Sequence, residues 1–173
     1  TKGASDASWS GSSTWSTVAI TAEFGDQIEL TATTTSGTVP LFSVTGPCTL
    51  KANAIQITKG TGTCALTAVV ANSDGYTGLS TKRNAVATPA TLPALSLTPM
   101  KVGAKQTLKT SITIGGKKIV LTYAVAAVSG SICSITGGTL TAKKKGTCSV
   151  VATAPGLAGY SQAFKQTLVV KVS

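Results

Sequence analysis

The residues best suited to chemistry in this chain are four cysteines, which form two separated pairs: Cys48 with Cys64, and Cys133 with Cys148. Thiolates can form disulfides, hold a metal ion or act as nucleophiles. A zinc site of four thiolates usually takes pairs about two to four residues apart, and these pairs are much wider. A nucleophilic cysteine needs an activating base, and the chain has no histidine. We therefore expect disulfides.

The two cysteine pairs belong to two copies of one sequence unit. The sequence Gly-Thr-Cys at 62–64 recurs at 146–148, and Gly-Tyr at 75–76 recurs at 159–160. Matches in the same order over most of both halves, with a period of about 80 residues, indicate a duplicated structural unit. Four cysteines allow three pairings, and the duplication favours one disulfide within each copy over the two cross-copy pairings.

Two disulfides have consequences for stability and location. A disulfide that closes a loop of about 15 residues contributes about 3 kcal/mol in the chain-entropy model. Persistent disulfides require an oxidising compartment, so we expect an extracellular or cell-surface location. The first residues do not resemble a signal peptide, and we expect that the export signal has been removed.

The elements that position the cysteines read as short strands. Apolar residues alternate, as at Leu168, Val170 and Val172, and runs of this kind are separated by Gly, Pro, Ser and Asp. This pattern is typical of antiparallel sheets. It predicts an all-β fold of two tandem β-sandwich domains, each with about seven strands and one disulfide. The expected parts are an arm at 1–16, a first domain at 17–88 and a second domain at 89–173.

The order of these motifs resembles the bacterial immunoglobulin-like repeats of secreted and cell-surface proteins. The resemblance rests on a Cys, then Gly-Thr-Cys, an alternating strand, Gly-Tyr and a last apolar strand, and it covers roughly residues 17–173. It implies an immunoglobulin-like sandwich in each unit. In that fold Tyr76 and Tyr160 would be corner tyrosines whose hydroxyl groups bond the backbone, with ligand stacking as the alternative. Function stays open, because such repeats act as spacers, adhesins or assembly subunits.

Catalytic and metal-binding groups are scarce. The chain has no histidine, and residues 91–173 contain neither Asp nor Glu. Glu23, Asp26 and Glu29 are close in sequence, but Asp26 and Glu29 would face opposite sides of a strand. Calcium would need several clustered oxygen ligands, and the expected linker near 87–93 has no carboxylate. We predict no catalytic residue, no metal site, no cofactor and no enzymatic activity.

Charge is distributed unevenly between the halves. The net charge is +10, residues 1–90 carry five basic and five acidic residues, and residues 91–173 carry ten lysines and no acid. Such a half attracts polyanions through a salt-screened field. The densest runs, and the candidate polyanion contacts, are Lys117 and Lys118 and then Lys143, Lys144 and Lys145. Alternatively, these lysines solvate hairpin tips and protect strand edges. Arginines are missing from this half and aromatics are few, which disfavours nucleic acid.

The first 16 residues lie outside the repeat. They are rich in Ser and Gly and contain Trp9 and Trp15, which share a side if the segment is extended. Each tryptophan can bury about 150–250 Å². We expect the arm to pack on its own domain or to dock on another subunit by strand addition or groove filling. Trp9 and Trp15 are therefore candidate assembly anchors.

The sequence predicts a non-enzymatic extracellular structural subunit or an adhesive stalk module, which could assemble into a filament or surface layer through its arm. One alternative is a module whose basic second domain binds an acidic polysaccharide or another polyanion. A further alternative is a virion decoration or tail protein. The expected partners are copies of the chain, other surface proteins or a polyanion. No apolar run reaches the roughly 18 residues that a membrane span needs.

Overall fold

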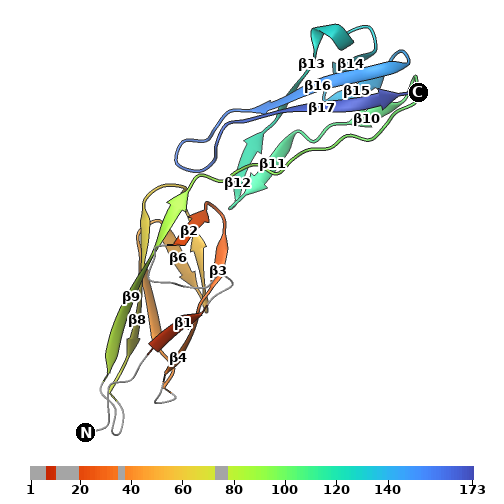
Figure 1. Ribbon diagram of the computed structural model, residues 1–173. Coiled ribbons are helices and arrows are strands. Elements are labelled where there is room, and N and C mark those ends of the chain that lie inside the picture. The colour runs from red at the N-terminus through yellow and green to blue at the C-terminus, as the bar shows by residue number, and fades with distance from the viewer. Residues whose placement is uncertain (1–6, 11–19, 35–37, 73–77) are drawn as a thin grey trace. The chain divides into compact units, whose positions relative to one another are not determined.

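The structure of the chain is a computed structural model that describes residues 7–10, 20–34, 38–72 and 78–173. The chain divides into unit 1 (Thr1–Ala90) and unit 2 (Thr91–Ser173), and strands dominate both (Figure 1). Among the described residues, no helix has the length and apolar character needed to cross a membrane. The helical content of this part of the chain is one 3-10 turn, η1 (Ala127–Ser129).

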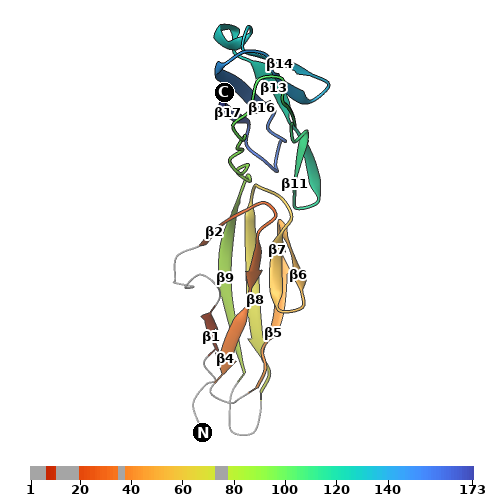
Figure 2. The same ribbon diagram turned by 90° about the vertical axis from the view of Figure 1, so that its right-hand side faces the viewer.

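Unit 1 contains two sheets and a separate strand pair. The four-stranded sheet has the order β2 (Ile20–Glu23), β9 (Leu79–Thr88), β8 (Thr63–Val70) and β5 (Leu41–Thr45). The three-stranded sheet has the order β3 (Gln27–Glu29), β7 (Ala54–Ile57) and β6 (Cys48–Lys51). The separate pair is β1 (Ala7–Ser10) with β4 (Thr31–Thr34). β8 and β9 run side by side along the unit (Figures 1 and 2).

Unit 2 repeats this plan. One sheet has the order β13 (Thr122–Val125), β16 (Gly146–Ala154) and β17 (Phe164–Val172). The other has the order β10 (Lys105–Thr107), β15 (Thr139–Ala142) and β14 (Cys133–Thr136). A hairpin of β11 (Ser111–Ile114) and β12 (Lys117–Val120) lies at the end of the unit opposite the C-terminus (Figure 2).

The strand order identifies both units as immunoglobulin-like sandwiches. In unit 1 the early strand β2 pairs in parallel with the last strand β9, and in unit 2 Met100 bridges Val172 of β17 in parallel. All other neighbouring strands in the two sheets of each unit are antiparallel. An early strand beside the last strand of one sheet, faced by a second sheet of three strands, is the arrangement of the immunoglobulin fold. The predicted fold class is confirmed.

The core follows from the alternation of each strand. In β16 the inward residues Cys148, Val150 and Ala152 are fully buried, while the residues between them are half-buried or exposed. In β8 Cys64, Leu66 and Ala68 do the same. Some inward residues are small, as Ala68 and Ala152 are, and the disulfide that joins the two sheets of each unit adds to the stability of the sandwich.

Candidate functional site

The cysteines form one disulfide in each unit. Cys48 bonds Cys64 with the Cα atoms 5.8 Å apart, and Cys133 bonds Cys148 with the Cα atoms 6.0 Å apart. Both distances lie in the usual disulfide range. Each bond joins the two sheets of its unit: the first links β6 to β8, and the second links β14 to β16. This is the pairing that the duplication predicts. With all four sulfurs bonded, none is available as a nucleophile or as a metal ligand.

One of the acidic residues of unit 1, Asp26, bonds the backbone through its side chain. Asp26 accepts a hydrogen bond from the N–H of Glu23 (2.8 Å), and its own N–H donates to the Glu23 carbonyl (3.0 Å). The carboxylate therefore closes the turn between β2 and β3. In the described part of the chain, no three His, Cys, Asp or Glu side chains are grouped closely enough to hold a metal ion.

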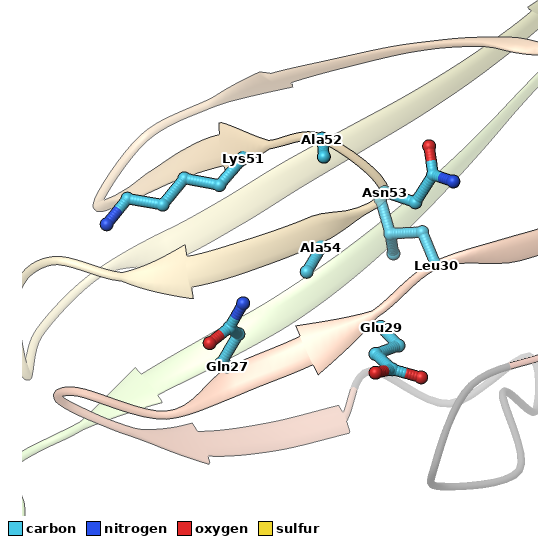
Figure 3. Close-up of a pocket in the computed structure, with 7 residues that line it drawn as sticks. All are labelled: Gln27, Glu29, Leu30, Lys51, Ala52, Asn53 and Ala54. Carbon is cyan, nitrogen blue, oxygen red and sulfur yellow. The ribbon is translucent and has the colours of Figure 1, made fainter.

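A hollow of about 380 Å³ lies on the outer side of the three-stranded sheet of unit 1 (Figure 3). Its floor is the buried Ala54, and the register places Glu29 and Lys51 on the strands to either side. The amides of Gln27 and Asn53 lie toward opposite ends. One carboxylate, one ammonium and two amides around a small apolar floor can bind a small polar group. Sequence reasoning missed this hollow, because only the register across three strands brings these residues together.

The structure does not bring the two predicted lysine runs together. Lys145 leads into Gly146, which pairs with Val172 near the end of β17. Lys117 and Lys118 begin β12, whose hairpin lies at the opposite end of unit 2. The candidate polyanion contacts therefore form two separate groups.

The first group is larger than the sequence runs suggest. The N–H of Met100 donates to the Lys171 carbonyl (2.9 Å), which places the neighbouring Lys101 beside the end of β17. The N–H of Gly103 donates to the Ala142 carbonyl (2.9 Å), and this bond holds the same loop against the run that starts at Lys143. All lysines at this end are exposed. We call them the loop-end cluster: Lys101, Lys105, Lys143, Lys144, Lys145 and Lys171.

The second group surrounds the connection between β16 and β17. The Lys117 ammonium lies 5.0 Å from the ring centre of Tyr160, a cation–π contact. Lys118 lines a hollow of about 200 Å³ together with Pro155 and Leu157. The same connection leads into Lys165 at the start of β17. Lys117, Lys118 and Lys165 form the hairpin-end cluster.

Sequence analysis did not single out four of these lysines because none has a lysine next to it: Lys101, Lys105, Lys165 and Lys171. The alignment of the two repeats could have identified them. In an immunoglobulin-like sandwich it places the loop before β10, the loop before β16 and the end of the last strand at the same end. Positions in different strands that meet at an end can be found from such an alignment even when no local charge run marks them.

The structure describes one of the two predicted corner tyrosines. Tyr76 lies outside the described residues. Tyr160 is half-buried in the turn between β16 and β17, where its N–H donates to the Leu157 carbonyl (2.9 Å), and its role as a corner tyrosine stays a prediction. Tyr123, which the sequence did not single out, donates its hydroxyl proton to the Lys109 carbonyl (2.7 Å). Burial raises the pKa of Tyr123 above its ordinary value of 10.0, so the hydroxyl remains a donor at physiological pH.

The arm contributes a strand to unit 1 of its own chain, which is the first of the two expected arrangements. β1 pairs antiparallel with β4, and Trp9 lies opposite Ala32. Trp15 lies outside the described residues. In unit 2 the strand equivalent to β4 is β11, and it pairs with the next strand of the chain, β12. The Leu121 N–H extends this pairing by donating to the Thr110 carbonyl (2.9 Å).

Leu30 and Leu108 are equivalent, because each donates its N–H to the hairpin turn of the sheet that contains the first cysteine of its unit. Ala32 and Thr110, two residues further on, are therefore equivalent as well. It follows that Trp9, opposite Ala32, and Leu121, opposite Thr110, occupy equivalent positions.

Comparison with known proteins yields solved structures only. No family model matches the chain, and no curated protein matches it. It resembles Drosophila N-cadherin EC1-4 (14% identity, 90% of this chain and 48% of that chain, TM-score 0.30) and the zebrafish RET cadherin-like domains 1 to 4 (11% identity, 99% and 52%, TM-score 0.39). The tandem Ig repeats of Dlar match at 13% identity over 98% of both chains, with a TM-score of 0.28. The chain spans about half the length of the two cadherin-type structures. At these TM-scores the likeness carries no argument, and the fold assignment rests on strand order.

Proposed function

We propose that the chain is a non-enzymatic extracellular structural or adhesive module of the bacterial immunoglobulin-like repeat type, and that copies associate through the N-terminal arm. The observation that supports this proposal is the β1–β4 ladder, which the structure forms within one chain and which a second copy could form in the same way. A segment outside the repeat supplies a strand to unit 1 at the rung that unit 2 fills from its own continuous chain.

The sequence between β4 and β5 explains why unit 1 takes its strand from elsewhere. Phe42 and Tyr123 are equivalent, since each pairs with the matching alanine of the next strand, Ala68 or Ala152. Counting back two residues makes Pro40 the equivalent of Leu121. Proline has no N–H, so unit 1 cannot form the bond that Leu121 makes to close its hairpin. The edge of β4 can therefore pair with an added strand. Main-chain hydrogen bonding allows that strand to come from the same chain or from a second copy.

The remaining features fit this role. Disulfides persist in oxidising compartments, which supports an extracellular or cell-surface location. The absence of histidine removes the commonest general base and nucleophile activator. The expected partners are further copies of the chain or other surface proteins.

Deleting residues 1–16 tests the proposal. We expect two folded units and a loss of self-association, measured by analytical ultracentrifugation over a range of concentrations. The double substitution Trp9→Ala and Trp15→Ala should reproduce most of the loss, because large aromatics supply most of the apolar area that an arm can bury. Unchanged self-association of the truncated chain would refute the assembly role and leave the arm as a cap of unit 1.

Binding of polyanions by unit 2 is a second candidate function, favoured by the loop-end cluster. Six exposed lysines share one end of a unit that has no carboxylate side chain. Replacing Lys143, Lys144 and Lys145 with Glu should strongly weaken salt-sensitive retention of unit 2 on an acidic matrix, while unit 1 passes through. Equal retention of both units would show that the charge asymmetry has no binding consequence.

A further inference from the structure

We infer that the outer face of β17 is a linear track for an unbranched acidic polysaccharide, gripped by the loop-end cluster at one end and the hairpin-end cluster at the other. The inference rests on the polyanion-binding function proposed above for unit 2. It adds the geometry of the site and the class of polymer.

β17 carries one lysine of each cluster on the same face. Its burial alternates, with Leu168, Val170 and Val172 inside and the residues between them outside. Lys165 and Lys171 are both outside. Six residues of extended strand separate them, which corresponds to about 20 Å. A polymer lying along β17 therefore meets cationic groups at two points rather than along its whole length.

The two points act independently in solution. About 20 Å is more than twice the Debye length of about 8 Å at physiological ionic strength, so an anion at one cluster gains little from the other. A chain that reaches both clusters gains from linkage instead, because binding at the first raises the effective concentration at the second. Affinity should therefore rise with polymer length in a step near the span of the track.

The strip between the clusters selects the kind of polymer. Thr167 and Val169 lie between the lysines on β17, and their partners on β16 are Val151 and Ser149. Thr153, opposite Lys165, also lies 2.8 Å by its hydroxyl from the hydroxyl of Thr122. Such hydroxyl groups can bond sugar hydroxyls. The strip contains no aromatic residue on which bases could stack, and unit 2 has no arginine for bidentate phosphate contacts.

Unit 1 has the same strand without the track. The register aligns Ser80 of β9 with Lys165 and Val86 with Lys171, and both replacements are exposed. One lysine, Lys82, stands between them. The same scaffold therefore provides an internal reference in which neither end of the strand is basic.

Oligogalacturonates of defined length, which are linear and carry one carboxylate per sugar, test the track against the full chain by calorimetry. We expect oligomers longer than about 20 Å to bind at least tenfold more tightly than shorter ones. Replacing the three hairpin-end lysines with Ser (K117S/K118S/K165S) should reduce the affinity for long oligomers to that for short ones. The charge-matched control in unit 1, K51S/K59S/K82S, should leave the length step in place; all six side chains are exposed.

The outcomes separate the track from the broader function. Salt-sensitive binding without a length step would overturn the track and leave polyanion binding by unit 2 standing. An equal loss in the unit 1 control would overturn both, because binding would then not depend on unit 2. Absence of binding to every oligomer would overturn both. Tighter binding of an oligothymidylate or of inorganic polyphosphate with the same number of charges would overturn the assignment to a polysaccharide.

Discussion

Units 1 and 2 both have buried apolar residues at matching inward positions, and they differ at outward positions. Leu66 and Val150 occupy the same core position after the second cysteine, and both are fully buried. Facing outward, Glu23, Gln27 and Val86 of unit 1 correspond to Lys101, Lys105 and Lys171 of unit 2. The sandwich therefore depends on the inward residues of each strand, and the outward residues can give one unit a charge that the other lacks.

The units also differ in the partner of one pair of equivalent strands, β4 in unit 1 and β11 in unit 2. Unit 2 closes it with a hairpin of its own, whereas unit 1 has Pro40 at the closing position and pairs the strand with the arm. One unit completes this pairing with its own repeat, and the other pairs with a segment outside the repeat. Assembly is therefore expected to depend on unit 1, and polyanion binding on unit 2.

The largest effect that would separate the units is removal of one disulfide. The double substitution C133A/C148A should lower the free energy of unfolding of unit 2 by about 2–5 kcal/mol and leave unit 1 almost unchanged. Replacing Cys148 alone with Ser should act in the same direction. C48A/C64A is the matched variant for unit 1. Thermal unfolding with separate probes for each unit would check this, and a shared loss of stability would show that the units do not unfold independently.

A smaller effect is expected at Tyr123. Tyr123→Phe removes the hydrogen bond to the Lys109 carbonyl and should lower the stability of unit 2 by about 1 kcal/mol at neutral pH. Because the folded pKa is raised, the neutral hydroxyl is favoured in the folded state. Its contribution is fully present below the unfolded pKa of about 10 and is lost as the pH rises through the folded pKa.

Denaturant unfolding of both proteins between pH 7 and pH 11 measures this. The difference between wild type and Tyr123→Phe should shrink at the alkaline end. A difference that is constant with pH would show that the hydroxyl bond does not hold the proton.

An effect of similar size is expected in two equivalent turns, between β6 and β7 of unit 1 and between β14 and β15 of unit 2. Unit 2 has Gly137 and Gly138 there, with φ of 56° and 75°, whereas unit 1 has Ala52 at φ 51°. A left-handed conformation is unfavourable for a residue with a Cβ, so Ala52→Gly should stabilise unit 1 by about 1 kcal/mol. The reverse change, Gly137→Ala, should destabilise unit 2 by a similar amount. Opposite signs in the denaturation midpoints would support this account, and equal signs would contradict it.

The sequence was sufficient for the framework because the signals for it are local or repeated. Alternation such as Leu168, Val170 and Val172 predicted strands, and duplication of the cysteine pairs predicted one disulfide in each unit.

The site residues were harder to predict because they depend on register and on how the ends of the sandwich come together. Lys101 and Lys171 are 70 positions apart and meet only through the parallel bridge at Met100. Trp9 as an assembly anchor stays a prediction, and its partner strand could not be chosen from the sequence, since the composition of the arm fits many edges. The hydroxyl bond of Tyr123 likewise joins segments whose separation in sequence carries no local pattern.

Disulfide trapping in trans tests the proposal of arm-mediated association most directly. Ser8 and Thr33 are paired residues of β1 and β4. Chains that carry only Ser8→Cys are mixed with chains that carry only Thr33→Cys under mild oxidation, so the designed bond can form only between two chains. Peptide mass spectrometry should find the β1 peptide of one chain joined through the introduced thiols to the β4 peptide of another. Failure of this bond to form in the mixture, while a single chain with both substitutions closes it internally, would contradict association through the arm.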